Sequence, residues 1–264
     1  MFFRFCLLLL LSLGIAVPAQ AEDYMAPSWE NLARTLVRFS AVKLSDPPIL
    51  NDYATLTACD LYETFHPNDF QWKRVQDAVL ESARNHIAVF PTGYTYDTPM
   101  DLDRYDFQKH FFRLTERTSI RRVNAFLLLR AAELGCGVAE IRSFPHQFRA
   151  VLLTPLTIEG LPLAPKDAQE LLSQMEADKN TARQIYARFN LRITFIAPLI
   201  PMDDHIHYSQ DGAQKAQSSV LLNARLDSVD FYKDPARTQL IYHQDDPTGA
   251  GGNILRQDSA HDGS

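Results

Sequence analysis

Hydrophobic and polar residues alternate most regularly between residues 183 and 196. The apolar residues that recur at every second position there are Ala187, Phe189, Leu191, Ile193 and Phe195. Residues 219–227 repeat the pattern with Val220, Leu222, Ala224 and Leu226. A two-residue period is typical of a β-strand with one buried face. The two segments therefore predict an antiparallel sheet with one face in water, and a change of phase at Ser228 and Val229 predicts a β-bulge.

Further strands are expected on both sides of these two. Aromatic and β-branched residues, separated by proline and glycine, favour strands at 94–96, 102–114, 148–158 and 239–243. These segments follow a helical region and add to the same sheet. The sequence thus predicts that most of the chain after residue 88 is β-structure.

A period of three to four residues predicts helices before residue 88. Ser28 is expected to cap a helix that ends before Pro47, a short helix covers 51–64, and Asn68 or Asp69 caps a third. The inward stripe of the third helix is Trp72, Val75, Val79, Ala83 and His86. A histidine on such a stripe, with no second His or Cys one turn away, is more typical of a core edge than of a metal site.

Two further helices are expected inside the β region. Pro165 begins a crossover helix over 165–178. Ser119 is expected to cap an inserted helix that Gly135 ends, with the apolar stripe Ile120, Val123, Leu127, Leu128 and Ala131. The predicted class is α+β, in which a helical N-terminal part (22–88) packs on a mostly antiparallel β domain (89–244) with one inserted and one crossover helix. Residues 245–264 are rich in Asp, Gly and Ser and are predicted to be a disordered tail.

The first 21 residues predict export. Arg4 is followed by an apolar run at 5–17, and Ala19 and Ala21 fit a cleavage site before Glu22. The run is shorter than the roughly 20 residues that a spanning helix needs, which favours a cleaved signal peptide (1–21) over an anchor. No later segment is long and apolar enough to span a bilayer. The expected location is periplasmic or extracellular, with no membrane span after cleavage.

Charge argues against nucleic-acid binding. Removal of residues 1–21 takes Arg4 from the 26 Lys and Arg and leaves the 32 Asp and Glu, so the net charge falls from −6 to −7. Nucleic-acid partners would require a basic surface. Arg121, Arg122 and Arg130 lie close in sequence, but in an acidic chain they favour a solvated basic face over an anion site.

Cysteine usage leaves two alternatives open. Cys59 and Cys136 are the cysteines that remain once Cys6 is removed with the signal peptide. In an oxidising compartment they can form one disulfide, and the chain-entropy model gives such a long loop roughly 4 kcal/mol. Two buried free thiols are the other alternative.

Metal-ligand residue types cluster once, after Pro201. Asp203 and Asp204 precede His205 and His207, and a His-x-His pair on a strand directs both imidazoles to one side. A zinc site would use His205, His207 and Asp203. The polar residues at 210–218 favour a loop, in which the imidazoles lack the partners that fix a ligating tautomer.

Several fragments resemble a family of exported bacterial proteins with a domain of unknown function. They are Tyr105-Asp106-Phe107 leading to Phe112-Arg113-Leu114, Phe148-Arg149-Ala150-Val151, Gly160-Leu161-Pro162-Leu163, Ala168, and Arg183-Gln184-Ile185-Tyr186-Ala187-Arg188. The fragments span 105–232 and are interrupted at 115–145, which resembles an insertion. The resemblance implies a β-rich exported domain. It implies no activity and no catalytic residues.

The sequence contains no catalytic or cofactor motif whose spacing is diagnostic, so no catalytic residue and no cofactor is assigned. This favours a non-enzymatic envelope or secreted module that binds an unknown protein or small molecule through its β domain. The alternative is a periplasmic hydrolase, with or without a metal, that uses His205 and His207 together with Asp203 or Asp204. Whether the protein is an enzyme stays open at this stage.

Overall fold

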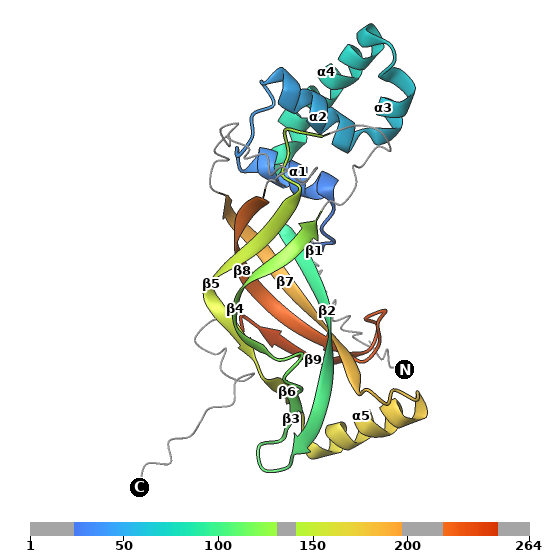
Figure 1. The fold of residues 1–264 in the computed structure, drawn as a ribbon, viewed down its shortest axis with the longest axis vertical. Coiled ribbons are helices and arrows are strands. Elements are labelled where there is room, and N and C mark those ends of the chain that lie inside the picture. Colours follow the sequence, from blue (N-terminus) through green and yellow to red (C-terminus); the bar gives the residue numbers. More distant parts are fainter. Residues whose placement is uncertain (1–23, 131–140, 197–218, 248–264) are drawn as a thin grey trace, which may run out of the picture.

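The structure is a computed structural model that describes residues 24–130, 141–196 and 219–247. Helices gather at one end of a long curled sheet (Figure 1). They are α1 (Trp29–Arg38), α2 (Pro47–Thr57), α3 (Cys59–Phe65), α4 (Asp69–His86) and the 3-10 turn η1 (Ile87–Val89). The helix α5 (Pro165–Ala177) lies at the opposite end and is the predicted crossover helix. These elements confirm the α+β class, while the domain limits stay a prediction.

The strands form one sheet of nine. They are β1 (Tyr24–Met25), β2 (Gly93–Asp106), β3 (Phe111–Leu114), β4 (Ile120–Arg130), β5 (Gln147–Ile158), β6 (Gly160–Pro162), β7 (Gln184–Ile196), β8 (Ser219–Tyr232) and β9 (Leu240–Asp245). The order is β4-β5-β8-β7-β2-β3-β6, with β1 beside β2 and β9 beside β8. The β1–β2 and β5–β8 pairs are parallel, and the other pairs between described strands are antiparallel.

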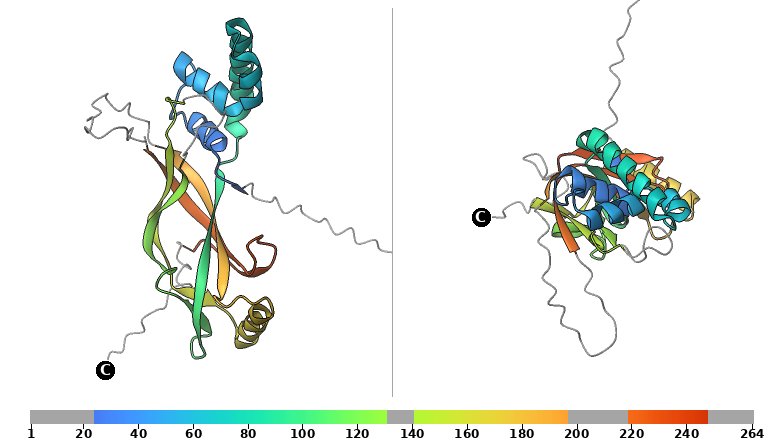
Figure 2. Two further views of the ribbon diagram at one scale, coloured as in Figure 1. Left: turned by 45° about the vertical axis from the view of Figure 1, so that its right-hand side comes forward. Right: turned by 90° about the horizontal axis from the view of Figure 1, so that it is seen from above.

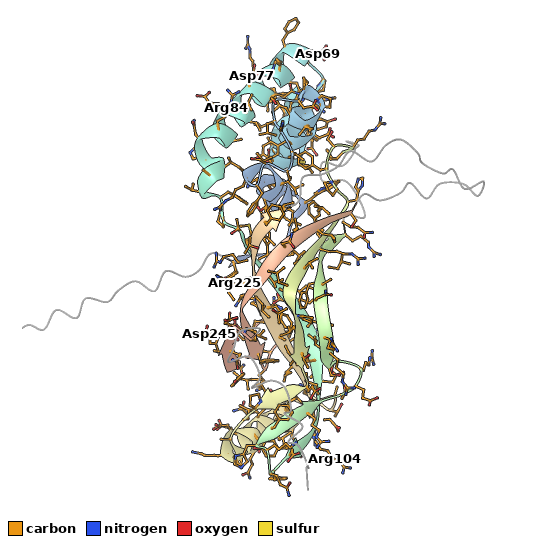
Figure 3. The ribbon with its side chains drawn as sticks, turned by 90° about the vertical axis from the view of Figure 1, so that its left-hand side faces the viewer. Asp69, Asp77, Arg84, Arg104, Arg225 and Asp245 are labelled. Atoms are coloured by element: carbon orange, nitrogen blue, oxygen red, sulfur yellow. The ribbon has the colours of Figure 1, made fainter. Side chains whose placement is uncertain are left out.

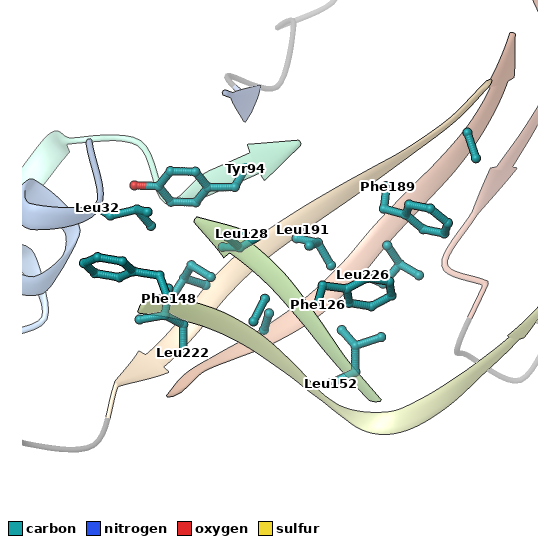
Figure 4. Close-up of a cluster of buried hydrophobic side chains, with 14 of the residues drawn as sticks. Leu32, Tyr94, Phe126, Leu128, Phe148, Leu152, Phe189, Leu191, Leu222 and Leu226 are labelled. Carbon is teal, nitrogen blue, oxygen red and sulfur yellow. The ribbon is translucent and has the colours of Figure 1, made fainter. Parts of the chain in front are cut away.

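The sheet curls so that its inner face encloses an aromatic core (Figure 4). The ring of Phe126 on β4 lies 5.1 Å from Tyr96 on β2 and 5.4 Å from Phe189 on β7. Most of the inward residues predicted for the two best strands are buried, namely Ala187, Phe189, Leu191, Ile193, Val220, Leu222, Ala224 and Leu226. The predicted bulge is also confirmed, because Asn190 pairs with Ser228 while Leu191 pairs with Leu226.

One residue predicted to face inward does not. Phe195 is 55% exposed, and the next residue, Ile196, is buried instead. The register between β7 and β8 shifts between Ile193 and Phe195. An extra residue in one strand exchanges the two faces from that point on. The alternating sequence could not show this shift, because its position depends on the partner strand.

The predicted inserted helix at 119–135 is wrong over 120–130, where the chain forms β4, and its remainder lies partly outside the described residues. Phe126 and Leu128 are buried while Leu127 between them is exposed. This two-residue alternation, together with antiparallel pairing to β5, prevails over the helical stripe. The stripe counted Leu127 and Leu128 as one face, which the strand separates.

Buried polar contacts hold the helices on the sheet. The hydroxyl of Tyr94, at the start of β2, donates to the carbonyl oxygen of Asn31 (2.8 Å) and lies 2.6 Å from Thr35 Oγ1 on α1. Burial raises the pKa of Tyr94, so it stays a neutral donor. On α2, a carboxylate oxygen of Asp52 accepts from the backbone N–H of Arg142 and Ser143 at 2.9 and 2.8 Å. Within the described ranges, no helix is long and apolar enough to span a bilayer.

The Gly160→Ala variant should be less stable, because β3 and β6 approach too closely for a side chain. A Cβ at residue 160 would collide with the carbonyl oxygen of Phe112 and the ring of Phe111. Overpacking of this kind costs about 1–3 kcal/mol. Urea unfolding should show that loss, while the neighbouring Glu159→Ala variant should unfold like the wild type. Equal stability of both variants would contradict the packing.

Candidate ligand pocket between the helices

A half-open pocket of about 300 Å³ lies between α1, α2, α4 and η1. Its lining residues are Arg34, Tyr53, Thr57, Val79, Ser82, Ala83, His86, Ile87 and Phe90. Ligand sites are concave, mostly apolar, and carry a few polar groups that orient the ligand. The volume lies at the lower end of the range for small-molecule sites. The pocket therefore has the size and lining of a site for a small ligand.

Arg34 supplies the cation of the pocket. It lies one turn after Glu30 on α1, and its Nη2 is 2.6 Å from a Glu30 carboxylate oxygen. The guanidinium also lies over the ring of Phe90, 5.6 Å from its centroid. The ion pair and the ring hold the guanidinium in place and leave it half-exposed to the pocket, with 32% of the side chain accessible.

Tyr53 on α2 also lines the pocket, and its hydroxyl interacts with the guanidinium of Arg34. The residue is only 3% exposed. Burial raises the pKa of Tyr53, and the guanidinium of Arg34 opposes part of that rise. The phenol is therefore protonated at neutral pH and can donate a hydrogen bond to a ligand.

His86 lies at the C-terminal end of α4. The stripe of α4 predicted to face inward is only partly buried: Trp72 and Ala83 are buried, whereas His86 is exposed and lines the pocket. Its Nδ1 is 2.9 Å from the carbonyl oxygen of Ser82. None of the lining residues is a carboxylate that could orient the imidazole as a catalytic base.

Arg34, Tyr53 and Phe90 could not be found from spacing, because three different segments bring them together. Each side chain has an ordinary structural explanation when it is considered alone. The signal that sequence inspection lacked is the angle between α1, α2 and α4, which the docking on the sheet determines.

A second polar cluster lies on the outer face of the sheet. Asn190 on β7 donates to Ser228 Oγ (2.8 Å) and to a carboxylate oxygen of Asp230 (2.9 Å) on β8. His243 on β9 lies between two carboxylates, with Nδ1 2.5 Å from Asp230 and Nε2 2.9 Å from Asp245. The hydrogen bond to Asp230 is the main cause that raises the pKa of His243. These bonds tie β9 to β8 and β8 to β7.

Ion pairs continue the polar cluster along the sheet. The guanidinium of Arg188 bonds both carboxylate oxygens of Asp97 on β2, at 2.9 and 3.2 Å. Further along, Asp227 bonds Arg192 (2.7 Å) and Arg225 (2.6 Å). Burial would raise the pKa of Asp227, but its hydrogen bonds outweigh burial and lower it. The cluster is a set of satisfied cross-strand pairs, which is typical of a stabilising surface rather than of a reactive site.

The Tyr-Asp-Phe fragment lies at the turn between β2 and β3. A carboxylate oxygen of Asp106 accepts from the backbone N–H of Gln108 (3.0 Å) and Lys109 (3.1 Å), and the bond from Lys109 is the main cause that lowers the pKa of Asp106. The hydroxyl of Tyr105 donates to the carbonyl oxygen of Leu163 (2.7 Å). The fragment thus shapes a turn and holds β2 near the start of α5.

Of the sequence-predicted site residues, Cys59 alone lies in the described part of the chain. Cys59 begins α3 and is disulfide-bonded. Cys136 lies outside the described residues, so its bond to Cys59 stays a prediction. Asp203, His205 and His207 also lie outside them. Within the described parts of the chain, no group of three or more His, Cys, Asp or Glu could hold a metal ion.

Comparison with known proteins finds that part of the chain matches a domain family without an assigned role. Residues 48–174 match the family model described as "Domain of unknown function (DUF4852)". The match begins in α2 and ends in α5, so it includes most of the helices, which the fragments at 105–232 did not. It confirms the expected resemblance to an uncharacterised domain family. No curated protein and no solved structure matches the chain.

Replacement of His243 by Gln should lower stability at acidic pH more than at alkaline pH. Because the hydrogen bond to Asp230 raises the folded-state pKa of His243 above its ordinary value of 6.5, the stabilising contribution of His243 is complete below pH 6.5 and is lost as the pH rises through the folded pKa. The side chain is 44% exposed, so solvent screening limits the contribution to at most about 1 kcal/mol. Urea unfolding of both proteins at about pH 5.5 and about pH 9 measures the difference. A larger difference at the higher pH would contradict this assignment.

Purified, untagged protein should contain substoichiometric zinc. The expected reason is that the polar sequence at 210–218 favours a loop around His205 and His207, and a loop would not orient the imidazoles for a metal. Elemental analysis provides the measurement. One equivalent of zinc that is lost in the His205→Ala and His207→Ala double variant, with a lower melting temperature, would show the opposite.

Proposed function

We propose that the protein is a non-enzymatic binding module that takes a small ligand in the pocket between the helices. The observation that carries the proposal is the pairing of a half-exposed cation, Arg34, with the buried hydroxyl of Tyr53 at the edge of an apolar wall. Buried donors beside apolar side chains are the usual means by which a pocket orients a ligand. The sequence favoured binding through the β domain, and the pocket moves the proposed site to the helical part.

The lining restricts the chemistry of the ligand. Val79, Ala83 and Ile87 form the apolar side, and the polar groups of Arg34 and Tyr53 supply hydrogen-bond donors. Glu30 already neutralises part of the charge on Arg34, so a dianion is favoured less than a single carboxylate. The proposed ligand is a small monocarboxylate or similar acceptor with an apolar body.

The proposal includes export. The apolar run at 5–17 and the alanines before Glu22 support cleavage after residue 21 and a periplasmic or extracellular location. A disulfide at Cys59 agrees with an oxidising compartment. N-terminal sequencing of the exported protein should find Glu22, and recovery of Met1 in a membrane fraction would replace cleavage by anchoring. The hydrolase alternative relies on Asp203, His205 and His207 and gains no support from the described residues.

The Arg34→Gln variant should lose ligand affinity. A panel of short aliphatic and aromatic monocarboxylates would be titrated against the wild type by calorimetry or by NMR. A hydrogen bond to a charged group contributes about 1.5–3 kcal/mol, so Arg34→Gln should weaken binding at least roughly tenfold. Arg84→Gln is the matched control, since Arg84 is exposed on α4 (Figure 3).

Two results would contradict the proposal that the pocket binds a monocarboxylate. One is that no member of the panel binds the wild type. The other is that Arg34→Gln and Arg84→Gln bind a ligand equally well. A Tyr53→Phe variant separates the donor from the ring, because it removes only the hydroxyl and keeps the packing of the buried residue.

A further inference from the structure

The outer face of the sheet exposes apolar side chains over β4, β5, the end of β7 and the start of β8. Four of the nine exposed large hydrophobic residues of the described chain lie there: Leu127 (39% exposed), Leu153 (88%), Phe195 (55%) and Leu221 (55%). The other five are divided between the helical end and the turns and termini of strands. Exposed apolar side chains that gather on one face of a protein mark an interaction site.

Strand register places these side chains next to one another. Leu127 pairs with Arg149, and Arg149 pairs with Leu221. In the next row Val151 pairs with Asn223, which pairs with Phe195. Directly paired residues point to the same face of a sheet, and neighbouring strands lie about 4.8 Å apart. We call the surface formed by Leu127, Val151, Leu153, Phe195 and Leu221 the outer apolar face.

This surface is basic although the chain is acidic. The strand segments 120–130, 147–158, 193–196 and 219–226 contain no Asp and no Glu. The arginines in these segments are Arg121, Arg122, Arg130, Arg149 and Arg225. Arg225 is paired with Asp227, which lies just beyond the surface, whereas Arg149 stands between Leu127 and Leu221. A net charge of −6 on the whole chain makes this local excess of cations specific to the face.

We propose that the outer apolar face is a peripheral docking surface for an anionic lipid bilayer. Apolar side chains enter the boundary between lipid headgroups and acyl chains, and arginines beside them pair with lipid phosphates. A second copy of the chain is a poorer occupant, because a two-fold contact through this face would bring arginines together without an acid to pair them. The mixture of Leu and Arg within one row suits a bilayer, which offers both apolar and anionic groups at every position.

The register shift in β7 is what completes the surface. Without the shift between Ile193 and Phe195, strict alternation would turn Phe195 toward the core. The shift instead adds an aromatic ring to the edge of a row of aliphatic residues. A phenylalanine ring adds apolar area that can enter the boundary between lipid headgroups and acyl chains.

The test is cosedimentation with lipid vesicles. The chain from Glu22 onward is used, because the apolar run at 5–17 would itself enter a bilayer, and this chain contains all described helices and strands. It should sediment with vesicles of phosphatidylglycerol and phosphatidylcholine in equal amounts, and much less with phosphatidylcholine alone. Binding to the anionic vesicles should fall as ionic strength rises.

Two substitutions test the two contributions separately. Arg149→Glu reverses one charge, and Leu153→Ser removes the most exposed apolar side chain of the face. Each should weaken partitioning at least roughly tenfold, because Arg149→Glu changes the charge near the surface by two units and Leu153→Ser removes an apolar side chain that would be buried in the bilayer. The matched controls are Arg104→Glu at the far end of the sheet (Figure 3) and Phe70→Ser on α4, and both should bind like the wild type.

Several results would overturn the proposal. Absence of binding to the anionic vesicles, or equal binding to neutral ones, would do so. Equal losses of vesicle binding in the controls and in the two test variants would also contradict the proposal. A dimer that is detected by light scattering and that Arg149→Glu dissociates would instead show that a second copy of the chain occupies the face. Thermal unfolding of each variant checks that the substitution leaves the fold intact. All four replaced side chains lie on the surface, so their melting temperatures should match that of the wild type.

Discussion

The buried hydroxyl of Tyr94 constrains how the helices sit on the sheet. A polar group without a partner in the interior costs about 1–3 kcal/mol, and Tyr94 meets its requirement only at one place on α1, where Asn31 and Thr35 lie. Asp52 makes a second polar joint to the chain before β5. These two sets of hydrogen bonds, one on α1 and one on α2, constrain both the position and the angle of the helices relative to the sheet. The shape of the pocket lined by Arg34 and the other helical residues depends on these hydrogen bonds, because they set the angles between the helices.

The long strands are joined differently on their two faces. Inside the curl, aromatic rings from β2, β4 and β7 pack against one another. On the outer face, near the middle of the sheet, charged and amide side chains link β2, β7, β8 and β9. Closer to the helices, the same face carries leucine, phenylalanine and arginine side chains. Figure 2 shows the curl of the sheet from two further sides. One sheet surface thus has a polar half with internal partners and an apolar half that faces outward.

Period alone was enough to predict the helices α1, α4 and α5 and the strands β7 and β8. It failed at β4 because the continuous apolar run at 125–129 is compatible with a helix as well as with a strand, and only pairing with β5 decides. It failed at Phe195 because a register shift depends on the opposite strand. Hydrophobic periodicity could not predict that Arg34 and Tyr53 line one pocket, since their proximity depends on the packing angles between the helices.

The strand β8 determines the order in which the sheet can be assembled. One edge of β8 pairs with β7, so β5 and β9 share the other edge, β5 along its first half and β9 along its second. All of β4, β5 and β7 precede β8 in the chain, and the parallel β5–β8 pairing spans about 70 residues, a separation that slows folding. During synthesis, which begins at the N-terminus, the β4-β5 pair and the strands β7, β2, β3 and β6 are therefore not yet joined in one sheet. They can join only when β8 becomes available for pairing. Strand edges that stay open until β8 is available are prone to pair wrongly, so the fold depends on its C-terminal strands for protection against misassembly.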